Sequence, residues 1–188
     1  YVFITTKYKA TKEEVLAYGI IYTLGLEWTL RSLKLVNNKS YTSLLLGLAL
    51  YINFSDMSQR MRIALWNLMT GSYVHHLIKN RISLGVDNIN ITFACLTYLR
   101  APCSPSIIIS ILAGIQVMVP NGLLEGVICK FIYVYTMFYY SYYDMVKGLG
   151  VGILCGYIIF CRYNSTIIWH LLNGVYLNFI LQQEFIIT

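Results

Sequence analysis

A small set of polar side chains in this apolar sequence has the residue types of a hydrolytic site: Glu27, Arg31, His76, His170 and Asn173. A carboxylate and an imidazole can together take a proton from water, provided that both reach the same water molecule. Glu27 and Arg31 are four residues apart, so on a helix they share one face and can form an ion pair. Charges inside a membrane are costly and usually mark function. A structural ion pair, or a contact with another subunit, is the simpler interpretation of these two.

These residues resemble the motifs of the CPBP family of intramembrane proteases. In that family Glu-Glu-x-x-x-Arg, Phe-x-x-x-His and His-x-x-x-Asn helices build a site that activates water, and the resemblance implies a metal-independent protease. The sequence departs from the pattern at three places. Leu26 replaces the first Glu, Ser72 replaces the Phe four residues before His76, and Asn173 follows His170 by three residues instead of four. Because such a site needs all its members together, we expect that the glutamate, the two histidines and the asparagine do not converge. The chain is then predicted to have no catalytic, cofactor-binding or metal site.

The composition predicts a protein of the lipid bilayer. Apolar residues make up 57% of the 188 residues, charged residues 12%, and the mean hydropathy is +0.61. The charged share is about half of the roughly 25% usual in soluble domains. Lipid solvates an apolar exterior, so a membrane protein needs no polar surface along its spans. No basic run interleaved with aromatic residues occurs, which excludes a nucleic-acid-binding stripe. The five cysteines form no Cys-x-x-Cys pair and are expected to be buried thiols.

Apolar stretches follow one another closely along the chain, and they predict an all-α, polytopic transmembrane bundle of six to eight helices. The stretches are 14–36, 41–54, 62–79, 89–99, 106–119, 123–143, 145–161 and 165–181. The predicted organisation is a polar N-terminal arm (1–13), a first helical repeat (14–103), a connecting segment (104–121) and a second helical repeat (122–188). Each repeat is expected to hold about three helices.

An internal repeat supports this division. Trp66 recurs as Trp169 and Gly71 recurs as Gly174, both 103 residues further on. Matches in the same order extend upstream over three apolar stretches, which indicates a duplication. The repeat makes His170 the counterpart of a residue on the third apolar stretch, so it also favours a packing role for that histidine.

Two further sets of residues are predicted to contact neighbouring helices or lipid. Small residues let membrane helices approach closely, and the predicted helix-packing glycines are Gly47, Gly71, Gly152, Gly156 and Gly174. Basic residues in short segments between apolar stretches attract anionic headgroups. The predicted lipid-binding residues are Arg60, Arg62, Lys79, Arg81 and Arg100, with cardiolipin as the lipid if the membrane is mitochondrial.

Residues 18–100 and 122–184 resemble the membrane repeats of the transmembrane protein 135-like family, within the mitochondrial inner-membrane translocase superfamily. The matching features are a Gly-Ile-Ile-Tyr helix with Leu30-Arg31, the Leu-Gly-Leu-Ala segment 46–49, and the polar loop 58–62 before Ile63-Ala64-Leu65-Trp66. The superfamily's longer Gly/Arg/Asp signature is not found. The resemblance implies a non-catalytic subunit, structural or accessory, of a larger complex of the mitochondrial inner membrane. A CPBP-type protease and a small translocase or transporter subunit are the alternatives.

Overall fold

The computed structural model describes residues 11–36, 44, 47–53, 57–119, 126–142, 170–171, 173–175 and 177–178. Apart from Leu44, which is in a 3₁₀-helical conformation, every regular element in these ranges is an α-helix, and the described residues contain no strand. The all-α part of the predicted fold class is therefore confirmed. No helix within the described ranges combines the length and the apolar character needed to cross a membrane.

Six labelled helices make up the described fold: α1 (Lys12–Ser32), α2 (Gly47–Asn53), α3 (Gln59–Ile78), α4 (Arg81–Tyr98), α5 (Cys103–Met118) and α6 (Val127–Tyr142). Residues 170–178 contribute a further helical piece, named here the C-terminal segment, of which 172 and 176 lie outside the described residues.

Local signals in the sequence set the helix starts. Thr11 caps α1 in a capping box with Glu14, and Asn80 caps α4 in the same way with Ser83. Ser58 accepts from the Met61 N–H at the start of α3. Because α3 and α4 are joined by only two residues, they form an antiparallel helical hairpin.

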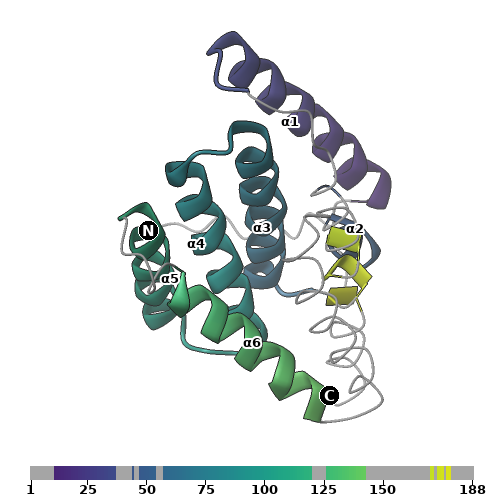
Figure 1. Ribbon diagram of the computed structural model, residues 1–188. Coiled ribbons are helices and arrows are strands. Elements are labelled where there is room, and N and C mark those ends of the chain that lie inside the picture. Colours follow the sequence, from purple (N-terminus) through teal and green to yellow (C-terminus); the bar gives the residue numbers. More distant parts are fainter. Residues whose placement is uncertain are drawn as a thin grey trace, which may run out of the picture.

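Helix α4 is central: α3 and α5 pack on either side of it, and α6 crosses its C-terminal half (Figure 1). Helix α1 lies at the edge, beyond α3, and the C-terminal segment lies near α2. The main apolar core lies between these elements and includes Leu65 and Ala64 of α3, Tyr98 of α4, Met137 of α6 and Leu177 of the C-terminal segment. The sequence-distant C-terminal segment is therefore part of the same core as α3.

Helices α4 and α5 approach each other at two glycines. A Cβ added to Gly85 would lie 3.0 Å from the Gly114 carbonyl oxygen, and one added to Gly114 would lie 2.8 Å from the Gly85 carbonyl oxygen. No side chain fits between backbones this close. The predicted connecting segment 104–121 thus contains most of α5, a helix packed against the centre of the fold. Its Ile- and Leu-rich sequence concealed the buried line of small residues, Ser106, Ser110, Ala113 and Gly114.

The predicted fourth stretch, 89–99, is shorter than the helix that contains it. Helix α4 begins earlier than predicted, at Arg81. Its first half mixes apolar residues with buried polar ones, among them Ser83 and Asp87. Because of this mixture, the spacing of apolar residues does not reveal the first half of the helix. The predicted second repeat falls mostly outside the described residues, so the duplication stays a prediction.

Candidate functional site

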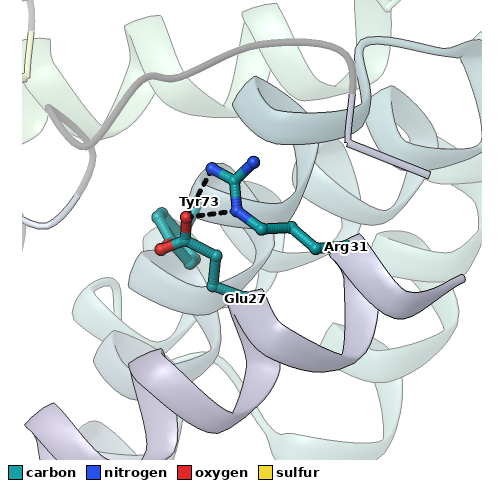
Figure 2. A network of polar contacts seen from close by, with 3 residues as sticks. All are labelled: Glu27, Arg31 and Tyr73. Carbon is teal, nitrogen blue, oxygen red and sulfur yellow. Dashed lines mark hydrogen bonds and ion pairs between the residues drawn. The ribbon is translucent and has the colours of Figure 1, made fainter. Parts of the chain in front are cut away.

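Glu27 is fixed from two sides. Arg31 donates to its Oε1 from Nε at 2.8 Å and from Nη2 at 2.6 Å, and the Tyr73 hydroxyl donates to its Oε2 at 3.0 Å (Figure 2). The pair predicted from the four-residue spacing is therefore in contact. Tyr73 is almost completely buried in α3. Its hydroxyl directs the carboxylate of α1 toward the interior face of α3.

The rings of three histidines contact one another in a row, with His76 in the middle. The rings of His75 and His76 are 5.3 Å apart, and the rings of His76 and His170 are 4.7 Å apart, edge to face. His75 Nδ1 lies 3.1 Å from the Ser83 hydroxyl, at the start of α4. His170 Nε2 lies 3.3 Å from the Ser72 hydroxyl, and both residues are buried. Two imidazoles from segments 94 residues apart in the chain thus meet inside the fold.

Asn173 extends this set toward α6. Its Oδ1 accepts a 2.8 Å hydrogen bond from the Tyr133 hydroxyl, and its side chain is buried. Asn173 and His170 are three residues apart, and residues three apart lie on the same face of a helix. Tyr73 and His76 have the same relation on α3. Polar contacts therefore run from Glu27 on α1, over one face of α3, to the C-terminal segment and α6.

Burial decides the charge state of the two contacting imidazoles. Taking a cation out of water disfavours the protonated form, and a second cation at ring-contact distance disfavours it further. Burial of His170 and partial burial of His76 therefore favour the neutral rings, in which one nitrogen donates and the other accepts.

The prediction that Glu27, His76, His170 and Asn173 do not converge on one site stays a prediction, although the rings of His76 and His170 do lie in contact. It relied on the short spacing of His170 and Asn173, and on the repeat that pairs His170 with Asn67. A three-residue spacing shares a helix face as well as a four-residue one. Asn67 is exposed whereas His170 is 3% exposed, so the two positions do not share an environment.

The predicted lipid-binding residues lie at both ends of the α3–α4 hairpin. Lys79 and Arg81 are exposed at the turn between the helices, and Arg100 is exposed at the far end. Arg62 is half-buried near the start of α3. Arg60 faces inward: it donates to the Ala101 carbonyl oxygen at 2.6 Å and to the Ser106 hydroxyl at 3.1 Å. Its guanidinium also stacks over the Phe93 ring, so Arg60 joins α3 to the α4–α5 turn.

The predicted packing glycines divide into described and undescribed positions. A Cβ on Gly71 would overlap the Asn90 side chain of α4, and one on Gly47 would lie 2.6 Å from the Met69 sulfur. Gly174 is buried in the C-terminal segment. Gly152 and Gly156 lie outside the described residues. Sequence reasoning missed the Gly85–Gly114 contact, because these two glycines belong to no repeated motif.

Several functional candidates were also missed. Each of three hydroxyl groups forms a hydrogen bond with a candidate residue: Ser72, Tyr73 and Tyr133. The two partners of each bond are 40 to 98 residues apart in the chain. Asp87 is buried in α4, and among the described residues its Oδ1 has no hydrogen-bond partner. Among the described residues, no group of three or more His, Cys, Asp or Glu side chains is placed to hold a metal ion.

Comparison with known proteins gives no further assignment. No family model matches the chain, and no curated protein or solved structure matches it.

Proposed function

We propose that this chain is a membrane-embedded hydrolase that activates water with a glutamate and histidines, in the manner of the CPBP proteases that its motifs resemble. The observation that carries the proposal is the contact between His76 and His170, 4.7 Å apart between ring centres. Glu27 is tied to the same helix one turn earlier, through Tyr73. The convergence that such a site requires thus has support from two helices and from the C-terminal segment.

The chemistry assigned to each residue follows from its contacts. Glu27, with Arg31 balancing its charge, takes the proton of water, directly or through a neutral imidazole, as the water oxygen attacks a carbonyl carbon. The tetrahedral intermediate then breaks its C–N bond, and the leaving amine accepts that proton. The second imidazole and Asn173 are hydrogen-bond donors of the kind that stabilise the oxyanion formed in that attack. The chain's own residues suffice for these steps, so the proposal needs no cofactor.

Exposed apolar side chains support the membrane part of the proposal. They cover α1 (Tyr18, Ile21, Leu24, Trp28), α5 (Ile107, Ile108, Ile111, Leu112, Ile115) and α6 (Val127, Phe131, Tyr135). Apolar surface of this extent marks contact with lipid or with another protein. Exposed basic residues lie at both ends of the α3–α4 hairpin, where they could contact lipid headgroups.

The test uses the protein in phosphatidylcholine–phosphatidylglycerol vesicles, with a pool of peptides that each carry about 20 apolar residues and a varied central sequence. We expect cleaved peptides in mass spectra, with oxygen from ¹⁸O-labelled water in the new carboxyl group. Glu27→Gln should abolish cleavage, whereas Glu13→Gln, at an exposed position of the same helix, should leave it unchanged. Equal products from both variants, or no cleavage by the wild-type protein, would contradict the proposal.

The non-catalytic interpretation remains the second proposal. An accessory subunit of a mitochondrial inner-membrane complex would also present apolar faces, there covered by partner subunits and lipid such as cardiolipin. Native mass spectrometry of the detergent-extracted protein separates the two proposals. Stable partner subunits together with an inactive wild-type protein would favour the accessory subunit, or the translocase alternative.

A further inference from the structure

We infer that Ser72 is a positioning residue that determines which nitrogen of His170 carries the proton. This inference rests on the proposed hydrolase and deepens it, because it assigns different tasks to the two contacting histidines. Ser72 occupies the place where the motif of the CPBP family has a phenylalanine. A phenylalanine has no hydroxyl, so this contact is a feature of the present chain.

The hydroxyl of Ser72 is isolated except for the histidine. Ser72 is 4% exposed and His170 is 3% exposed, and the Ser72 Oγ lies 3.3 Å from the His170 Nε2. Other hydroxyls in these helices bond back to their own helix: Thr97 to Phe93, Ser110 to Ser106, and Thr136 to Ile132. Ser72 makes no such bond, and within the described residues His170 is its one hydrogen-bond partner.

The direction of this hydrogen bond follows from satisfying both groups. A serine hydroxyl has one proton, and a buried polar proton needs an acceptor. The acceptor within reach is the Nε2 lone pair of His170. If Nε2 instead carried a proton and donated it to Oγ, the serine proton would be buried without an acceptor. Nε2 is therefore unprotonated, and the ring proton of neutral His170 is on Nδ1.

This tautomer divides the work between the two imidazoles. Ser72 hydrogen-bonds the Nε2 lone pair of His170, so in the proposed hydrolase His170 has the role of a hydrogen-bond donor and not of a base. His76 lies in edge-to-face contact with His170, and the proposal assigns to His76 the role of the basic imidazole. Ser72 acts through His170 and does not itself bond to the reacting atoms.

Nitrogen NMR of the protein labelled with ¹⁵N-histidine tests the tautomer without any substrate. The chain has three histidines, so His75→Gln and His76→Gln variants assign the spectrum. We expect the His170 Nε2 resonance at the position of an unprotonated nitrogen and Nδ1 at that of a protonated one. Ser72→Ala should move both toward a mixture of tautomers, and Ser72→Thr, which keeps a hydroxyl, should restore them. A wild-type His170 protonated at Nε2, or a spectrum unchanged in Ser72→Ala, would overturn the inference.

The peptide assay gives the functional readout. Ser72→Ala should lower kcat about tenfold with KM unchanged, because part of the enzyme then holds His170 as the unproductive tautomer. The acid limb of the pH profile should move to higher pH, since the hydrogen bond no longer favours the neutral ring. Ser110→Ala, at a buried serine of α5, should change neither. Labelling of wild-type Ser72 by a fluorophosphonate would overturn the inference, because it would identify the serine as a nucleophile. Should wild-type protein cleave no peptide while the tautomer result holds, the hydrolase proposal fails and the assignment of the proton on His170 stands.

Discussion

The α4–α5 contact and the polar cluster around His170 are both buried and both rich in small or polar residues, but they satisfy their hydrogen bonds in opposite ways. In α5 the hydroxyls of Ser106 and Ser110 donate to the carbonyl groups four residues before them, and Ser106 also accepts from another helix, from Arg60 of α3. Around His170, Ser72 and Tyr133 bond to groups on another segment. The contact between α4 and α5 therefore depends on close packing at Gly85 and Gly114. The bonds around His170 fix the orientation of particular side chains across segments, which packing alone does not require.

The largest expected effect separates chemistry from packing in the polar cluster. His170→Gln keeps a polar side chain beside Ser72 but removes the imidazole, so we expect peptide cleavage to fall roughly 10²–10⁴-fold. The thermal unfolding midpoint in detergent should change little. Its matched control is His75→Gln, at the histidine that contacts Ser83 instead of the C-terminal segment. An equal loss of activity in both variants would mean that the histidines act as one structural cluster.

The second largest effect belongs to the α4–α5 contact. Gly114→Leu forces a side chain against the Gly85 carbonyl oxygen and the Ile89 side chain. Overpacking of this kind costs about 1–3 kcal/mol, so the unfolding midpoint should fall clearly. Gly25→Leu is the control, since a Cβ there meets nothing within 4 Å. A Gly114→Leu protein as stable as the wild type would show that α5 is free to shift away from α4.

The two regions also differ in how far the sequence could predict them. The helical class followed from apolar stretches, and the Glu27–Arg31 contact from a local spacing of four. The start of α4 could not be located, because Asp87 and Ser83 interrupt its apolar pattern although both are buried. The histidine contact was missed because it joins segments 94 residues apart, and a local spacing rule carries no information about such distances. The repeat also pairs the exposed Asn67 with the buried His170, so it gives no guide to the environment of that histidine.

A smaller effect is expected where the polar cluster reaches the edge of the fold. Tyr73→Phe removes the hydroxyl that donates to Glu27, one of few interior contacts of α1. Hydrogen bonds to a charged group contribute about 1.5–3 kcal/mol when buried, and Arg31, which shares the carboxylate, is 41% exposed to water. We therefore expect a loss of about 1 kcal/mol, below that range and typical of an ordinary hydrogen bond, seen mainly as faster hydrogen exchange in α1. Tyr135→Phe, on an exposed face of α6, should leave that exchange unchanged. Faster exchange throughout α3 and α4 would contradict the view that Tyr73 serves α1 alone.

The smallest effect is expected at Ser110, and it tests the comparison most directly. Its hydroxyl donates to the Ser106 carbonyl oxygen at 2.6 Å, within one helix. Ser110→Ala removes the donor, but alanine favours helix and fills nearly the same space in the α4–α5 contact. Losing the hydrogen bond and losing the buried hydroxyl then nearly cancel, so stability should change by less than about 0.5 kcal/mol. Denaturant titration in detergent measures this change. The hydroxyl of Ser72 has no such internal partner among the described residues, and its removal takes away the hydrogen bond to His170 Nε2. A loss at Ser110 as large as that at Ser72 would mean that both regions depend on their hydroxyls for packing. The distinction between a packed contact and an oriented polar cluster would then be lost.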